Sequence, residues 1–208
     1  MSFFLTGTDT EVGKTVISAW LVLHYHYHYW KPIQSGMDSP DTTTVQKITG
    51  FDDSFFFSPA YELHQPLSPH ESAKRDGIEI ELTNFLLPQE KEKIIVEGAG
   101  GILVPINEKH FIADIIRLLK LPILLVARSG LGTINHTLLT VSELKKRNLP
   151  LQGIILNGEK NQSNKEAIEK YSGVSVVSEL EPLKTLDKKT LLSYKPGRKL
   201  DEIFASTG

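Results

Sequence analysis

The first residues in the chain that could carry out chemistry are a lysine and a hydroxyl behind a glycine. Gly13, Lys14 and Thr15 follow an apolar run that ends at Thr6. In a loop between a strand and a helix, backbone N–H groups and the helix N-terminus favour an anion. A lysine in this position contacts the β- and γ-phosphates of a nucleotide, and the hydroxyl after it reaches magnesium. The pattern therefore predicts a phosphate-binding loop.

The loop departs from the usual spacing at one position. The common pattern places a glycine five residues before Gly13, where this chain has Thr8, and the glycine here is Gly7. The loop is therefore one residue longer than usual. An ordinary strand-to-helix turn with a solvated lysine is the alternative, but the order of strand, loop and helix favours phosphate binding.

Two further stretches place a charged residue at the end of an apolar segment. Lys31 is followed by Ser35 and Gly36, and a lysine there would add positive charge where phosphoryl charge develops. Glu97 ends a second apolar run and precedes the small residues 98–101, which let a ligand approach the backbone. A carboxylate at the tip of a strand beside a phosphate loop is the usual second anchor for magnesium. A solvated glutamate at a strand end is the alternative.

A second acidic position, Asp41, is a weaker candidate for the magnesium site. Asp41 follows Pro40 and precedes three threonines, so it is either a magnesium ligand or the N-cap of a helix. Asp38 is a rival for the metal role. Both interpretations stay open at this stage.

The segment 24–29 alternates histidine and tyrosine. On an extended chain His24, His26 and His28 would share one face, so a metal site is one interpretation. The other is a helix that runs into an aromatic-rich strand, with partly solvated imidazoles, and we favour it. Farther on, residues 39–88 contain five prolines and little periodicity. A connection this long is often functional, and we expect part of a substrate lid there.

A parallel sheet would bring these residues together. Apolar runs alternate with helical segments, which indicates βαβ units with helices on both faces of a mostly parallel sheet. The predicted strands lie near 2–6, 28–33, 93–97, 122–127, 151–156 and 174–177, and the predicted helices near 14–25, 42–49, 111–120, 134–147 and 163–171. Open sheets of this kind bind ligands beyond the carboxyl ends of their strands, which is where the candidates fall.

Composition indicates a single globular α/β domain over residues 1–208. The chain is 40% hydrophobic and 23% charged, and it has no cysteine. No apolar run approaches the roughly 20 residues that span a membrane, and no leader pattern opens the sequence, so we expect a cytoplasmic protein. The net charge of −2 gives no reason to expect nucleic acid or a membrane surface as a partner.

Five segments together resemble the dethiobiotin synthetase family of P-loop proteins. They are residues 7–15, 31–36, 68–70, 96–101 and 131–136. The resemblance covers about residues 1–160 in unbroken order and includes the long phosphate loop. It implies a homodimeric ligase that uses ATP and Mg²⁺ to join CO₂ to 7,8-diaminononanoate. A carbamate and its anhydride with phosphate would lead to the cyclic urea of dethiobiotin, in the penultimate step of biotin synthesis.

The resemblance also implies roles for individual residues around the phosphates. Lys14 would bind phosphate, Lys31 would stabilise the carbamate and the transferring group, and Thr10 and Ser35 would hydrogen-bond the carbamate region. Mg²⁺ would lie near Thr15, Asp41 and Glu97. The residues implied near the nucleotide are Gly7, Asp9, Thr10, Glu11, Val12, Gly13, Lys14, Thr15, Val16, Asn157 and Pro182.

The implied substrate site extends to a second subunit. The family places the turn before one helix against the substrate carboxylate of the neighbouring protomer. The implied substrate residues are Ser35, Gly98, Gly132, Thr133, Ile134 and Asn135. Past Asn157, whose amide would read adenine, the match thins, so that the tail 183–208 is poorly assigned. The segment 82–92 is also shorter than its counterpart in the family.

A nucleotide-dependent switch protein is an alternative to the ligase. Partition-type ATPases share this kind of fold and act as nucleotide-controlled switches rather than making a small molecule. They usually carry an additional lysine near the start of the phosphate loop, where this chain has Thr8, Asp9 and Thr10. The ligase is therefore the favoured prediction. We expect Lys14 and Lys31 to lie on loops rather than in the core.

Overall fold

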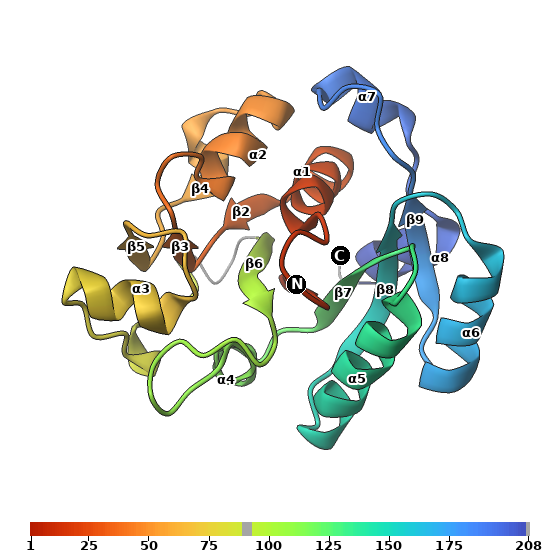
Figure 1. Ribbon diagram of the computed structural model, residues 1–208. Coiled ribbons are helices and arrows are strands. Elements are labelled where there is room, and N and C mark those ends of the chain that lie inside the picture. The colour runs from red at the N-terminus through yellow and green to blue at the C-terminus, as the bar shows by residue number, and fades with distance from the viewer. Residues whose placement is uncertain (89–92, 207–208) are drawn as a thin grey trace.

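A parallel sheet forms the centre of the molecule. The computed structural model describes residues 1–88 and 93–206. Seven strands form one sheet in the order β4-β2-β6-β1-β7-β8-β9, and every neighbouring pair is parallel. Figure 1 shows the helices arranged around these strands. The predicted α/β class with a mostly parallel sheet is confirmed.

The elements of the described residues have the following bounds. The strands of the large sheet are β1 (Phe3–Gly7), β2 (His28–Trp30), β4 (Phe56–Phe57), β6 (Ile94–Gly101), β7 (Ile123–Arg128), β8 (Leu151–Asn157) and β9 (Val176–Leu180). A separate parallel pair joins β3 (Ile33–Ser35) to β5 (Tyr61–Leu63). The helices are α1 (Lys14–Tyr25), α2 (Asp41–Thr49), α3 (Pro69–Asp76), α4 (Ile112–Leu119), α5 (Thr133–Lys146), α6 (Gln162–Ser172), α7 (Lys188–Ser193) and α8 (Arg198–Ala205).

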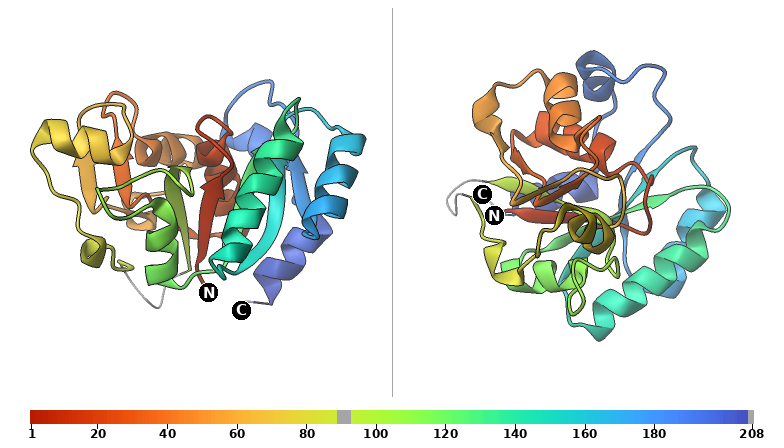
Figure 2. Two further views of the ribbon diagram at one scale, coloured as in Figure 1. Left: turned by 60° about the horizontal axis from the view of Figure 1, so that its bottom comes forward. Right: turned by 60° about the vertical axis from the view of Figure 1, so that its left-hand side comes forward.

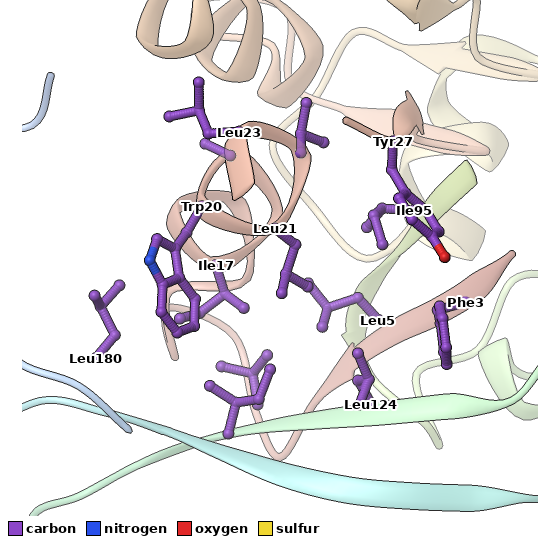
Figure 3. Close-up of a cluster of buried hydrophobic side chains, with 14 of the residues drawn as sticks. Phe3, Leu5, Ile17, Trp20, Leu21, Leu23, Tyr27, Ile95, Leu124 and Leu180 are labelled. Carbon is purple, nitrogen blue, oxygen red and sulfur yellow. The ribbon is translucent and has the colours of Figure 1, made fainter. Parts of the chain in front are cut away.

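Helices cover both faces of the sheet, as the views in Figure 2 show. Successive side chains of a strand point to opposite faces, so Phe3 and Leu5 pack on one side and Phe4 on the other. α1, α2, α7 and α8 supply the cluster around Phe3 and Leu5, while α3, α4 and α5 supply the cluster around Phe4. Figure 3 shows Trp20 and Leu21 of α1 in the first cluster. Burial on both faces explains why these strands are continuous apolar runs.

The predicted strand at 28–33 is wrong in its length. β2 ends at Trp30, and the chain turns through Lys31 and Pro32 before β3 begins in the separate sheet. Proline has no N–H to donate to a neighbouring strand, and the Pro32 carbonyl instead accepts a hydrogen bond from the N–H of Ala60. The turn leaves Lys31 at the carboxyl end of β2.

The histidine–tyrosine segment is the end of a helix followed by a strand, as we favoured. His26 ends α1 in the left-handed conformation, with a φ of 54°. The three imidazoles have different partners: His24 lies edge-on to Trp20, whereas the His26 and His28 rings stack on phenylalanines. They therefore do not share one extended face.

Several elements were absent from the sequence prediction. α3 is short and polar, and it begins with Pro69 at a position that suits proline. α7 and α8 form part of the tail 183–208, whose last two residues lie outside the described residues. In the segment 82–92, Leu82–Asn84 forms one 3₁₀ turn, and residues 89–92 lie outside the described part. None of the described helices is long and apolar enough to cross a membrane.

Candidate active site

The loop between β1 and α1 has the predicted order of strand, loop and helix. Gly13 precedes the helix with a φ of 88°, a left-handed conformation that favours glycine. A Cβ on Gly13 would collide with the side-chain amide of Asn157, and one on Gly7 would lie 2.7 Å from Val12. Both glycines are therefore required by close approach within the loop.

Lys14 is buried at the first position of α1, with 8% of its surface exposed. Its Nζ donates to the backbone carbonyl of Asp9 at 3.0 Å, and no ion pair to it is found within the described residues. Burial lowers the pKa of Lys14 to about 8, although the nearby Glu97 carboxylate opposes the shift. The ammonium group therefore has donors and charge that the protein does not fully use.

Glu97 is the centre of the second part of the site. It lies within the buried first part of β6, with 1% of its surface exposed, and the strand continues to Gly101 rather than ending at Glu97 as predicted. Its Oε1 accepts from Lys31 Nζ at 3.0 Å and from Thr15 Oγ1 at 3.1 Å. Its Oε2 accepts from Ser18 Oγ at 2.6 Å and from Tyr29 OH at 3.0 Å. The interpretation of Glu97 as a solvated strand-end residue is wrong.

Lys31 joins Glu97 to Asp41. Its Nζ lies 2.7 Å from Asp41 Oδ2, and Asp41 Oδ1 accepts from Thr15 Oγ1 at 2.8 Å. Burial opposes the charge of Lys31, but attraction to Glu97 and Asp41 is stronger and raises the pKa of the lysine. Burial alone would raise the pKa of the Asp41 carboxyl. The positive charge of Lys31 outweighs burial, so the pKa of Asp41 is lowered. The two charges thus stabilise one another.

Two expectations about these residues need correction. Lys14 and Lys31 were expected on loops rather than in the core, but both are buried, with 8% and 4% of their surfaces exposed, and only Lys31 lies in a turn, between β2 and β3. Asp41 is the first residue of α2, but the N-cap is Pro40 and no side-chain cap bond is present. The Asp41 carboxylate contacts Lys31 and Thr15 instead, while Asp38 is exposed. The capping alternative for Asp41 is therefore wrong.

The three predicted metal ligands fit magnesium in chemical type. Thr15 has one hydroxyl hydrogen, yet its Oγ1 lies close to a carboxylate oxygen of both Asp41 and Glu97. Hydroxyl and carboxylate oxygens are ligands that Mg²⁺ prefers, and it commonly combines one or two carboxylates with phosphate oxygens and water. In the part of the chain that the structure describes, no group of three or more His, Asp or Glu side chains is placed to hold a metal. A magnesium ion here would therefore complete its coordination with phosphate and water.

A cavity of about 700 Å³ lies over this cluster. It brings together nine of the predicted site residues: Thr10, Glu11, Gly13, Lys14, Thr15, Lys31, Ser35, Asp41 and Glu97. Residues 66–69 also line it, so part of the expected lid segment borders the site. Ser35 Oγ is buried and has no hydrogen-bond partner in the described part of the chain. It is therefore available to a bound molecule.

The remaining predicted residues lie elsewhere. Gly132, Thr133 and Asn157 line a different cavity of about 310 Å³. The turn there is tied down by Thr133, whose hydroxyl donates to the carbonyl of Arg128, and Asn135 is exposed one turn into α5. Ile134 is partly buried against the cluster under α5 and α6.

Four predicted residues close to the sheet differ in their contacts. Val12 and Val16 face the core beneath α1 rather than the loop cavity. Gly98 lies beside the site, and its carbonyl accepts from Lys31 Nζ at 3.2 Å. Pro182 is exposed beyond the end of β9. The loop is further joined to β7 by an ion pair of 3.4 Å between Asp9 and Arg128.

Sequence reasoning missed Ser18 and Tyr29. Ser18 lies three residues after Thr15 on the same helix face, a spacing that could have indicated it. Tyr29 pairs with Ile95 in the parallel register between β2 and β6, so its side chain lies on the same sheet face as that of Glu97. That register is a property of the folded sheet, and no local pattern predicts it.

A buried lysine behind a strand–loop–helix turn, with a buried carboxylate on the adjacent strand, defines a P-loop nucleotide-binding protein. A family model described as "AAA domain" matches residues 1–190. Two solved structures have the same fold. A plasmid partition protein from Borrelia burgdorferi has a TM-score of 0.59 and is 13% identical over 100% of this chain and 99% of its own. A ParA family ATPase from Chlorobium tepidum has a TM-score of 0.58 and is 14% identical over 99% of this chain and 96% of its own.

Relatives in sequence narrow the class to one family. The ATP-dependent dethiobiotin synthetase of Paramagnetospirillum magneticum is 46% identical over 93% of this chain and 94% of its own length. The ATP-dependent dethiobiotin synthetase of Lawsonia intracellularis is 43% identical over 98% of this chain and 99% of its own length. The chain belongs to the dethiobiotin synthetase family, and the expected family is confirmed. The partition proteins, at 13–14% identity, are similar in fold alone.

Proposed function

We propose that the protein is an ATP- and Mg²⁺-dependent ligase that carboxylates 7,8-diaminononanoate with CO₂ and closes the ureido ring of dethiobiotin. This is the penultimate step of biotin synthesis. The observation that carries the proposal is one cavity with two buried lysines, one paired with carboxylates and one not. A site of this kind can neutralise anions while it aligns two reactants. We also propose that the enzyme works in the cytoplasm.

The chemistry explains why ATP is needed. One amine adds to CO₂ and releases a proton, giving a carbamate. A carbamate is a poor acyl donor, because its leaving group would be oxide. Its oxygen therefore attacks the γ-phosphorus of ATP and ADP leaves. The second amine then attacks the carbonyl carbon, phosphate leaves, and loss of a proton completes the ring.

The residues of the cavity have distinct roles in this proposal. Lys14 donates to the phosphates, and Lys31 stabilises the carbamate and the group in transfer. The hydroxyls of Thr10 and Ser35 hydrogen-bond the carbamate, and the unpartnered Ser35 Oγ supports that role. Mg²⁺, held near Thr15, Asp41 and Glu97, would neutralise phosphate charge when bound.

We propose that two residues, Asn157 and Pro182, contact the adenine base of ATP. Asn157 lies at the edge of the loop, where its Nδ2 donates to the Val12 carbonyl at 2.9 Å, and Pro182 follows the end of β9. Asn157 is the last residue of β8 and Pro182 lies just beyond β9, so both are at the carboxyl edge of the sheet, where open sheets bind ligands.

We propose that the active form is a homodimer with the substrate site between the subunits. Asn135 and the turn before it do not line the cavity over Lys31, so a role in binding the same substrate requires a second copy of the chain. Large apolar side chains are exposed near this turn and support a contact surface. They are Leu131, Leu139 and Leu103, with exposed fractions of 107%, 62% and 49%.

Mixed dimers test the shared site. In the proposed dimer, each site takes Lys31 from one protomer and Asn135 from the other. A mixed dimer of one Lys31→Ala chain and one Asn135→Ala chain therefore has one site with both native residues and one site with neither. At a diamine concentration well below the wild-type KM, where Asn135→Ala is impaired through its raised KM, we expect the mixture to be more active than either variant alone. Activity no greater than that of the separate variants, with mixed dimers confirmed by mass spectrometry, would show that both residues act within one chain.

The reaction itself is tested by incorporation of labelled bicarbonate into an acid-stable product. Purified protein, Mg²⁺, ATP and 7,8-diaminononanoate are combined, and each is omitted in turn. A free carbamate decomposes in acid, whereas a cyclic urea survives. We expect label to be retained only in the complete mixture. ATP hydrolysis that is independent of the diamine, with no retained label, would instead favour a nucleotide switch.

A further inference from the structure

The two oxygens of Glu97 have different surroundings. Oε1 faces Lys31 and Thr15, which the proposed function places at the phosphates and magnesium. Oε2 faces away from them, toward Ser18 Oγ at 2.6 Å and Tyr29 OH at 3.0 Å. A carboxylate oxygen offers two lone pairs, so these two donors saturate Oε2.

Water cannot readily replace either donor. Tyr29 and Ser18 are fully buried, and Glu97 has 1% of its surface exposed. A buried charge requires hydrogen bonds, and a lost donor that water cannot replace carries the full desolvation penalty. The orientation of Glu97 therefore depends on two protein hydroxyls.

The two donors come from different parts of the chain. Ser18 lies on the face of α1 that also carries Thr15, so the helix that follows the phosphate loop holds the carboxylate directly. Tyr29 comes from β2, next to β6 in the sheet and two residues before Lys31. The same short strand thus supplies both a donor to Oε2 and, through the turn that follows, a donor to Oε1.

We propose that Tyr29 and Ser18 are positioning residues, which hold Oε2 of Glu97 and so keep Oε1 directed toward Lys31 and Thr15. This inference rests on the proposed function, because it gives the orientation of Glu97 its purpose in phosphoryl transfer. Neither residue lines the cavity over Lys31. Both act through the carboxylate.

Tyr29→Phe is the variant that tests the inference, since it removes only the hydroxyl and keeps the buried ring. We expect kcat to fall on the order of tenfold, the cost of one hydrogen bond to a charged group. The KM for the diamine should change less than about twofold, because the substrate contacts remain. Ser18→Ala, which also keeps its place in α1, should show the same pattern.

A binding measurement separates positioning from a structural role. The affinity of a non-hydrolysable ATP analogue is measured by calorimetry with Mg²⁺ and with EDTA, and the ratio of the two affinities gives the coupling between metal and nucleotide. We expect this ratio to fall on the order of tenfold in Tyr29→Phe, with the affinity in EDTA unchanged. A purely structural role would lower Tm and leave the ratio at the wild-type value, and that result would overturn the inference.

Tyr25→Phe is a matched control. The Tyr25 hydroxyl also donates to a carboxylate, Asp201 at 2.8 Å, but it lies at the other end of α1 from the phosphate loop. We expect wild-type kcat and a wild-type ratio in this variant. Equal losses in Tyr25→Phe and Tyr29→Phe would also overturn the inference, because they would show a general effect of lost tyrosine hydroxyls.

A double variant tests the route through Glu97. In a Glu97→Gln background, Tyr29→Phe should change the ratio less than about twofold, whereas independent effects would multiply.

Failure of the proposed function can be distinguished from failure of the inference. Wild-type protein that forms no acid-stable product overturns the function, while an Mg²⁺ ratio that is insensitive to Tyr29→Phe overturns the positioning role.

Discussion

Two buried lysines at one cavity have opposite environments. Lys31 contacts two carboxylates, at 2.7 Å for Asp41 and 3.0 Å for Glu97. Lys14 contacts only a backbone carbonyl at 3.0 Å among the described residues. Burial lowers the pKa of Lys14 to about 8, whereas attraction to Glu97 and Asp41 outweighs burial and raises the pKa of Lys31.

The difference separates a charge that the protein neutralises from one that it leaves for a ligand. The carboxylates around Lys31 hold that side chain in place before any substrate binds. Lys14 costs the folded protein stability, because a buried ammonium without a carboxylate partner is unfavourable. That cost is typical of functional sites, where stability is lower than it could be. A bound phosphate would supply the missing negative charge.

The largest expected effect is common to both lysines. Replacing either Lys14 or Lys31 with methionine should lower turnover by about 10³-fold or more, since each removes charge that we propose acts on the transferring phosphoryl group. Retention of labelled bicarbonate in acid-stable product measures this. Near-normal turnover in either variant would remove that lysine from the site.

Stability should respond to the two replacements in opposite directions. Lys31→Met leaves two buried carboxylates without their cation and should lower the free energy of unfolding by about 3 kcal/mol. Lys14→Met removes an unfavourable buried charge and should raise it by about 3 kcal/mol at pH 7. Urea unfolding without nucleotide measures both values. Equal destabilisation by the two substitutions would contradict the contrast between the lysines.

The pH dependence of stability gives a sharper test of Lys14. Its pKa is lowered from 10.5 to about 8 in the folded protein, so between these values the unfolded chain binds the extra proton. The free energy of unfolding should therefore rise with pH across that window, by about 3 kcal/mol, relative to Lys14→Met. Lys31 has a raised pKa, so its stabilisation should be present below 10.5 and lost only above it. Parallel pH profiles for wild type and Lys14→Met would exclude the shift.

We expect the smallest loss of activity on replacing Asn135, which does not line the cavity that holds Lys14 and Lys31. Its role in binding the substrate carboxylate would be similar in the ground and transition states. Asn135→Ala should therefore raise the KM for the diamine about tenfold and lower kcat less than about threefold. Steady-state kinetics with varied diamine decides this, and an unchanged KM would exclude Asn135 from substrate binding.

Much of the fold was predictable because the main strands are buried on both faces. The runs that became β1, β6, β7 and β8 are continuous and apolar, and their positions agree with the structure within a few residues. Short elements were not predictable in this way. β3 is too short for a pattern to mark it, and α3 is too polar to show an apolar periodicity. The turn at Pro32 divided what the pattern predicted as one strand.

The sequence by itself determined which chemical groups the site contains. A glycine-bounded loop between an apolar strand and a helix predicts where Lys14 and Thr15 lie, because local backbone geometry gives that turn its function. The position of Glu97 on a buried strand was also predictable, although β6 continues beyond it to Gly101. Each of these inferences depends on residues close together in the chain.

Only the tertiary structure decided what each group contacts. Asp41 pairs with Lys31 rather than capping α2, and Tyr29 reaches Glu97 although 68 residues separate them. It also placed the turn before Asn135 outside the cavity over Lys31. These contacts depend on the order and register of parallel strands, which bring distant segments to one edge of the sheet. The pKa values of the lysines follow from those contacts, since burial and neighbouring charge exist only after folding.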